Sequence, residues 1–128
     1  MRIFKTKGLT KFARQENIDD ASLVEAISRA ERGIIDADLG GGLIKQRIPR
    51  QGHGRSGGYR TIIVYRAQDR AVFLFGFAKN DRENIGHDEL SSWKQIALKY
   101  LNANEEVITK AIEDGLLKEI GSNEELED

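Results

Sequence analysis

Cysteine is absent from this chain of 128 residues, and proline occurs only once. Without thiols, the chain cannot form a disulfide scaffold, a cysteine-ligated zinc site or a thiol-based catalytic centre. No apolar run reaches the roughly 20 residues that a membrane-spanning helix needs, and the first residues lack the apolar segment of a signal peptide. We therefore expect a soluble cytoplasmic protein with no membrane partner, folded as a single domain over residues 1–128.

The net charge of −1 conceals an uneven distribution of charge along the chain. Residues 1–44 carry seven basic and seven acidic side chains, residues 45–82 carry nine and two, and residues 83–128 carry four and twelve. A basic middle segment beside an acidic end favours a local anion-binding surface, and nucleic acid is the most common large anion. The opposing interpretation is that these arginines pair with the acidic C-terminal helices or with an acidic partner protein.

The first part of the sequence predicts a short strand at Ile3 and Phe4, a weak helix over residues 10–17, and a firmer helix that begins at Asp19 or Asp20. Apolar residues at helical spacing define the buried face of that second helix: Leu23, Ile27, Ala30 and Ile34. Glycines at 33 and at 40–42 then indicate a helix end and a turn.

The middle of the sequence predicts strands. We expect one over residues 43–48 that ends at Pro49, a glycine-rich loop over residues 51–58, and a strand over residues 59–66. A turn at residues 67–70 leads into a central strand over residues 71–77. Phe73, Phe75 and Phe77 alternate along that strand, and we expect them to share one face, as core rather than as a platform for stacking bases.

Helices return near the C-terminus. Asp88 is expected to cap one helix and Asn104 a second, with Gly115 following the second helix. Residues 116–120 fit either an edge strand or a docked tail, and residues 122–128 are acidic and poor in apolar residues. Helices, then a meander of strands, then helices predict an α+β fold: a small antiparallel sheet with N-terminal helices on one face and C-terminal helices beside it.

Basic side chains alternate along the predicted strands. Lys45 and Arg47 share one face of their strand, and Arg60 and Arg66 share a face of theirs, with the apolar Ile62 and Val64 between them. A surface with a dry centre and cationic ends suits a phosphodiester backbone. His53, in the glycine-rich loop, is a candidate acid or base, although a lone loop histidine is usually just exposed. Two histidines without matched carboxylates predict no metal site, and we expect no cofactor.

Two neighbouring segments, residues 58–66 and 69–85, resemble the RelE/HigB group of bacterial toxins. The chain is most similar to a RelE-like branch of the RelE/ParE superfamily with a helical C-terminal extension, here residues 88–120, followed by a flexible tail at 121–128. The resemblance implies a toxin of a type II toxin–antitoxin pair that acts as a metal-independent endoribonuclease on messenger RNA, in many members on the ribosome. It also implies a small antitoxin partner with a helix-turn-helix domain.

The resemblance assigns roles residue by residue. Arg60 matches the family arginine that contacts the scissile phosphate, and Lys79 and Arg82 match the basic motif after the last central strand; these three form the expected catalytic set. The remaining candidates are expected to bind RNA: Lys45, Arg47, His53, Arg55, Tyr59 and Arg66. Where RelE has an arginine directly after the lysine, this chain has Asn80, and where RelE has a tyrosine near the motif's end, it has Ile85 and Gly86.

Two other functions stay open from the sequence. ParE proteins share the fold and act on DNA gyrase without cleaving RNA. The chain could also be an interaction module whose basic face binds an acidic partner.

Overall fold

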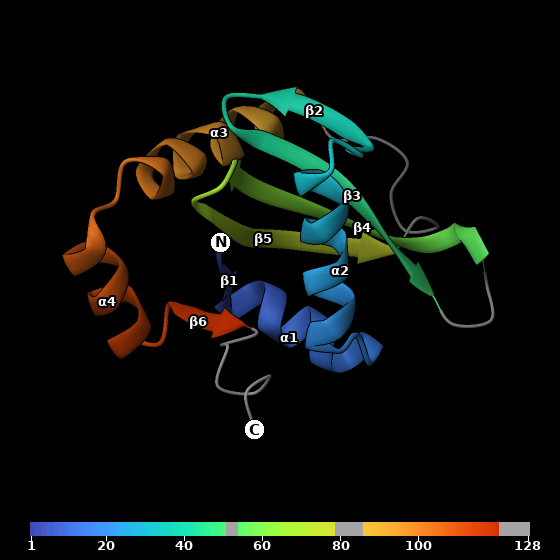
Figure 1. The fold of residues 1–128 in the computed structure, drawn as a ribbon, viewed down its shortest axis with the longest axis horizontal. Coiled ribbons are helices and arrows are strands. Elements are labelled where there is room, and N and C mark those ends of the chain that lie inside the picture. The colour runs from blue at the N-terminus through green and yellow to red at the C-terminus, as the bar shows by residue number, and fades with distance from the viewer. Residues whose placement is uncertain (51–53, 79–85, 121–128) are drawn as a thin grey trace.

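A mixed sheet with helices on both faces forms the centre of the protein (Figure 1). The computed structural model describes residues 1–50, 54–78 and 86–120. Within this range, residues 54–57 are described by their backbone alone. The elements are, in chain order, β1 (Arg2–Thr6), α1 (Lys7–Glu16), α2 (Asp20–Glu31), β2 (Ala37–Gly40), β3 (Leu43–Arg50), β4 (Gly54–Arg66), β5 (Arg70–Ala78), α3 (His87–Leu101), α4 (Glu105–Glu113) and β6 (Leu117–Ile120).

The sheet has the strand order β2-β3-β4-β5-β1-β6. All neighbouring strands are antiparallel except β1 and β5, which are parallel. This arrangement confirms the predicted α+β class. β4 and β5 lie in the interior of the sheet, as their nearly continuous apolar sequences require, because both faces of these strands are covered.

Two hydrophobic clusters, one on each face, hold the helices to the sheet. On one face, α1 and α2 bury Leu9, Ala13, Leu23 and Ile27 against the strands. On the other face, which we call the α3 face, the C-terminal helices pack through Ala97 and Ile108 on a different set of strand residues, including Ile62, Val64 and Leu74. Each helix pair therefore buries its apolar stripe against one side of the sheet.

The N-terminal helices begin at capping residues. Thr6 and Asp19 accept hydrogen bonds from the backbone N–H groups of Leu9 and Ser22, which satisfies donors that lack partners within the helix. The weak helix predicted near residue 10 is confirmed and starts earlier, at Lys7. The prediction that Ile34 extends the buried face of α2 is wrong: the helix ends at Glu31, Gly33 takes a φ of 85°, and Ile34 is half exposed.

Two predictions about β3 and β4 are also wrong. β3 does not stop before Pro49 but runs to Arg50, and β4 already starts at Gly54 within the predicted loop. The pairing register shifts between Ile48 and Arg50, and Pro49 lies two residues after Arg47, so its nitrogen, like the Arg47 N–H, faces away from β4 and no ladder bond is lost. Gly58 also belongs to the strand, and an added Cβ there would lie 2.4 Å from the Ile48 carbonyl oxygen. Glycine thus allows the two strands to approach closely.

A second bulge changes the face of the phenylalanines in β5. Ile62 pairs with Phe75 and Ile63 with Phe73, so that Leu74 is an extra residue. Phe73 therefore packs with α1 and α2, whereas Phe77 packs in the cluster beneath α3. The prediction that Phe73, Phe75 and Phe77 share one face is wrong for this reason. The Leu74 carbonyl accepts a hydrogen bond from the hydroxyl of Thr6, 2.9 Å away.

The C-terminal helices follow the predicted pattern with one change at a helix start. Gly86 rather than Asp88 is the N-cap of α3, and the Glu89 carboxylate accepts the Gly86 N–H. Asn104 caps α4 and Gly115 follows it at a φ of 78°, as predicted. β6 pairs with β1, so the segment predicted as either an edge strand or a docked tail forms the edge strand. No helix of the described residues is long and apolar enough to cross a membrane.

Candidate nucleic-acid interface

Arg47 and Arg60 lie directly opposite each other on neighbouring strands β3 and β4. Alternation along β4 places Arg60 on the same face as Ile62 and Val64, which is the α3 face. Arg47 and Arg60 exchange no backbone hydrogen bonds with each other, because both backbone groups of Arg47 bond to the side chains of Asp36 and Arg29. Side chains approach most closely in this type of antiparallel pair. Two cations from separate strands are thus brought together.

Arg60 is buried, with only 8% of the residue exposed, and forms no ion pair with any described residue. Burial lowers the pKa of its guanidinium, the positive charge of Arg47 lowers it further, and the carboxylate of Asp36 opposes both effects. Arginine starts from so high a pKa that Arg60 remains charged at neutral pH. Its only described hydrogen bond is a long one, 3.5 Å, to the carbonyl of Tyr59. An anion that docks here would compensate this charge.

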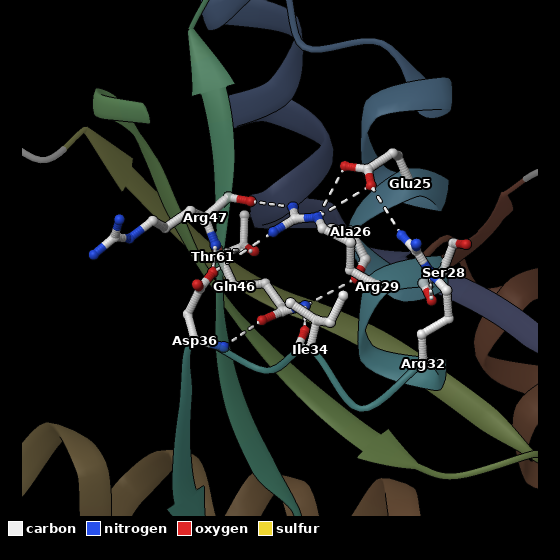
Figure 2. Close-up of polar contacts among 10 residues, drawn as sticks. All are labelled: Glu25, Ala26, Ser28, Arg29, Arg32, Ile34, Asp36, Gln46, Arg47 and Thr61. Carbon is white, nitrogen blue, oxygen red and sulfur yellow. Dashed lines mark hydrogen bonds and ion pairs between the residues drawn. The ribbon is translucent and has the colours of Figure 1, made fainter. Parts of the chain in front are cut away.

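The side chain of Arg47 points away from the polar cluster around it (Figure 2). Arg47 is exposed, and its guanidinium takes part in no described ion pair. Lys45, two residues earlier and opposite Ile62, is half-buried on the same face. The structure therefore brings together three of the predicted cationic residues, Lys45, Arg47 and Arg60; we call them the β3–β4 basic cluster.

Aromatic side chains adjoin this cluster on β5. Phe77 lies opposite Arg60 and Phe75 opposite Ile62. The ring of Phe75 lies 5.4 Å from that of Trp93 on α3, centroid to centroid, and 6.0 Å from that of Phe77. Phe77 is buried and Phe75 is about one-third exposed. The basic cluster thus has apolar rings on the side of α3.

Arg66 is at the other end of β4, six residues from Arg60, or about 20 Å along an extended strand. Its guanidinium donates to the carbonyl of Leu101 at 3.1 Å and lies 3.6 Å from the carboxylate of Asp69. Arg70 binds the same end of α3, through the carbonyls of Tyr100 and Ala103. Arg66 is therefore not near the β3–β4 basic cluster; it holds the C-terminal helices to the sheet.

The alternative that the arginines pair within the chain therefore applies to some of them. Arg2 forms ion pairs with Glu105 and Glu119 of the C-terminal segment. Arg47 and Arg60 form none with the described part of that segment. The two groups of arginines thus differ: one joins the acidic C-terminal segment to the sheet, and the other forms no direct ion pair among the described residues.

Tyr59 lies on the opposite face of the sheet from Arg60. It is buried against α1, its ring meets that of Phe12 edge-on, and its hydroxyl donates to the carboxylate of Glu16 at 3.0 Å. Burial and the bond to Glu16 raise the pKa of the Tyr59 hydroxyl. The structure does not bring this predicted RNA-binding residue to the basic cluster.

Several predicted site residues lie outside the described residues. These are His53, Lys79 and Arg82, together with the side chain of Arg55. Among the described residues, no group of three histidines or carboxylates gathers to hold a metal ion.

Sequence reasoning missed the residues that surround Arg47. Gln46 is fully buried, and its amide nitrogen donates to the carbonyls of Ala26 and Ile34, while its amide oxygen accepts the N–H of Asp36 (Figure 2). Arg29 and Asp36 then contact the backbone of Arg47 itself. The one available signal is a glutamine that occupies an inward-facing strand position, between Ile44 and Ile48.

Comparison with known proteins identifies the family. The family model described as the RelE toxin of the RelE/RelB toxin–antitoxin system matches residues 1–120, which is nearly the whole chain. A comparison with curated proteins finds no match. The match spans β1 to β6, including both strands that carry the basic cluster. With the α+β fold above, it shows that this chain belongs to the RelE toxin family and is a toxin with a cognate antitoxin.

Proposed function

We propose that this toxin is an endoribonuclease that cleaves messenger RNA and so inhibits translation. The observation that carries the proposal is the pairing of Arg47 with the buried Arg60, which has no described carboxylate partner. A buried cation without a counterion costs folding free energy, and such a group is typical of a site whose partner is an external anion. The scissile phosphate of RNA is that anion in this proposal.

The chemistry requires a base, an acid and a group that stabilises negative charge. The 2′-oxygen attacks the adjacent phosphorus, the bond from phosphorus to the 5′-oxygen breaks, and the products are a cyclic phosphate and a 5′-hydroxyl. Arg60 and Arg47 would stabilise the added charge on the phosphoryl oxygens by charge-assisted hydrogen bonds. Lys45 would hold a neighbouring phosphate.

The family motif supplies the base and a further contact to the phosphate, and the departing 5′-oxygen takes its proton from solvent water. Lys79 would accept the proton of the 2′-hydroxyl, because nearby arginines disfavour the charged lysine and lower its pKa. Arg82 would assist on the phosphate. No metal or cofactor enters this scheme. His53, Arg55 and Tyr59 remain candidates from the sequence, and the buried position of Tyr59 argues against its direct contact with RNA.

The surroundings of the reaction are also part of the proposal. We infer a single cytoplasmic toxin domain over residues 1–128 that meets its message on the ribosome, where the substrate is held in a reactive geometry. Its antitoxin would be a small helix-turn-helix protein encoded next to it. An adjacent reading frame that encodes no such protein would count against this part of the proposal.

The decisive experiment is induction of the toxin in cells, followed by mapping of transcript 5′ ends. Wild type is expected to arrest growth and to create new 5′-hydroxyl ends, and Arg60→Ala to lose both. Arg14→Ala is the matched control, because it removes an exposed arginine from α1 on the opposite face. New ends that persist unchanged in Arg60→Ala would refute the proposed site.

The same experiment distinguishes the alternatives. Growth arrest with DNA-damage signalling and intact transcripts would instead support a ParE-like action on gyrase. Absence of any toxicity, together with no affinity of the purified protein for RNA, would support an interaction module.

A further inference from the structure

The outer edge of β3 lacks a neighbouring strand beside Arg47. β2 pairs with β3 only from Leu43 to Lys45. Beyond that point two side chains occupy the place of a strand: the carboxylate of Asp36 accepts the Arg47 N–H at 2.7 Å, and a guanidinium nitrogen of Arg29 donates to the Arg47 carbonyl at 2.5 Å. Both backbone groups of Arg47 on this side are therefore bonded to side chains rather than to water.

The two side chains are themselves held in place. Arg29 and Asp36 lie 3.7 Å apart as an ion pair, with side-chain exposures of 19% and 25%, although Asp36 as a whole residue is exposed. Glu25, one helical turn before Arg29, accepts two further hydrogen bonds from the Arg29 Nε, at 2.9 and 3.1 Å. The buried Gln46 fixes the backbone of Asp36. The position of the Arg47 backbone thus depends on α2 and on the segment that follows it (Figure 2).

Asp36 also acts on Arg60 across the strands. Its charge raises the pKa of Arg60, against the lowering by Arg47 and by burial. The Asp36 carboxylate therefore anchors the backbone of Arg47 and also partly compensates the positive charge of Arg60. Neither role was assigned to Asp36 by the sequence or by the family match.

We infer that Arg29 and Asp36 are positioning residues for the Arg47–Arg60 pair: they replace a missing strand and so fix where Arg47 presents its guanidinium to a phosphate. This inference rests on the proposed function, since positioning matters only if the pair binds RNA. A displacement of about 1 Å in a catalytic group can cost as much as 100-fold in rate. A loss of roughly 10- to 100-fold in message cleavage is expected for Arg29→Ala.

A double-mutant cycle in a cell-free translation extract tests the inference, with initial cleavage rates measured at limiting and saturating message. If Arg29 acts through Arg47, Arg29→Ala should lower the saturated rate in the wild-type background and change little in Arg47→Ala. Arg29→Lys should recover part of the loss because it keeps one charged donor. Arg32→Ala is the matched control: Arg32 lies on the same α2 end and is largely exposed, and its side chain reaches Glu25 at 4.0 Å and donates to the carbonyl of Ser28 at 3.4 Å, but forms no described bond to Arg47.

A readout independent of activity separates this inference from the proposed function. Hydrogen exchange at the Arg47 amide, measured by NMR, should be faster in Asp36→Ala than in wild type, because the N–H loses its acceptor. Asp36→Asn keeps an acceptor oxygen and should show the smaller change, which keeps the test valid if Asp36→Ala folds poorly. Thermal unfolding of each variant shows whether the fold is retained.

The possible outcomes distinguish the positioning role of Arg29 and Asp36 from the proposed nuclease function. Rate losses of Arg29→Ala and Arg47→Ala that multiply, or an Arg29→Ala enzyme as active as wild type, would overturn the inference while leaving the nuclease intact. Unchanged exchange at the Arg47 amide would also overturn it. Full cleavage by Arg47→Ala and Arg60→Ala would instead refute the proposed site, and absence of message cleavage by wild type would refute the proposed function, whatever the exchange data show.

Discussion

Replacement of Arg60 by methionine is expected to leave the free energy of unfolding unchanged or to raise it, while it removes RNA cleavage. Arg60 is buried, and the described residues offer it no carboxylate partner. Methionine has a similar length and can pack among the apolar neighbours Ile62 and Phe77. The substitution therefore exchanges a cation that Asp36 compensates only in part for an apolar side chain of similar volume, a change that is often neutral or stabilising.

The magnitude follows from the distance between the two arginines. Side chains directly opposite each other on antiparallel strands have Cβ atoms about 5 Å apart. At an assumed charge separation of about 6 Å and an effective dielectric constant between about 20 and 80, repulsion amounts to about 1 to 3 kcal/mol. The loss of the long Tyr59 carbonyl bond subtracts little from this gain, because a 3.5 Å contact is at the limit of hydrogen bonding. The removal of Arg60 should thus gain on the order of 1 kcal/mol.

Urea unfolding of four proteins measures this coupling: wild type, Arg47→Met, Arg60→Met and the double variant. The single variants should each be as stable as wild type or more so, and their gains should not add, since either one removes the repulsion. Part of the gain should disappear in high salt, which screens the exposed Arg47. A loss of more than about 1 kcal/mol in Arg60→Met would refute the reasoning, because it would mean that Arg60 has a favourable partner in the folded state.

Three further predictions concern stability. Gly76→Ala should lower the unfolding free energy by about 1 to 3 kcal/mol in urea titration, since the new Cβ would lie 2.6 Å from the ring of Phe12; a stability equal to that of wild type would show that the ring moves freely. Arg70→Met should cost about 2 to 4 kcal/mol in the same titration, because two carbonyls at the end of α3 lose a buried charged donor, and a neutral result would mean that α3 is not held there. Burial raises the pKa of all three tyrosines, so the stability present below their ordinary pKa of about 10 should be lost as the pH rises through their folded-state values. The near-ultraviolet absorbance of tyrosinate should therefore appear together with unfolding rather than before it, for Tyr59, Tyr65 and Tyr100.

Local patterns were enough to locate most helices and strands. Apolar spacing predicted α2 and α3, the Asn104 cap predicted the start of α4, and the β-branched run predicted most of β4. The errors fell where a distant partner decides the local structure. The β3–β4 register shifts at Pro49 without ending β3, and Leu74 is an extra residue because β4 and β5 pair out of step at that point. Neither shift has a signal in the single strand.

The candidate site divides in the same way. Alternation predicted that Arg60 and Arg66 share a face, and it predicted the common face of Lys45 and Arg47. It did not predict that Arg66 bonds to the carbonyl of Leu101, or that Arg60 faces Arg47, because strand register depends on residues far apart in the chain. Side chains alternate along β4, and Arg60 is on the α3 face. Its neighbour Tyr59 therefore lies on the other face and packs against α1.

The sequence by itself determined the chemistry and its periodicity: no thiols, a basic middle segment, an acidic end, apolar faces with spacings of helix and strand, and motifs similar to those of the RelE family. The tertiary structure decided which charges are compensated. Three arginines bond to the C-terminal segment: Arg2, Arg66 and Arg70. The backbone of Arg47 is held by side chains, and Arg60 is buried. Electrostatic environment depends on distances between residues that are remote in sequence, and only folding sets those distances.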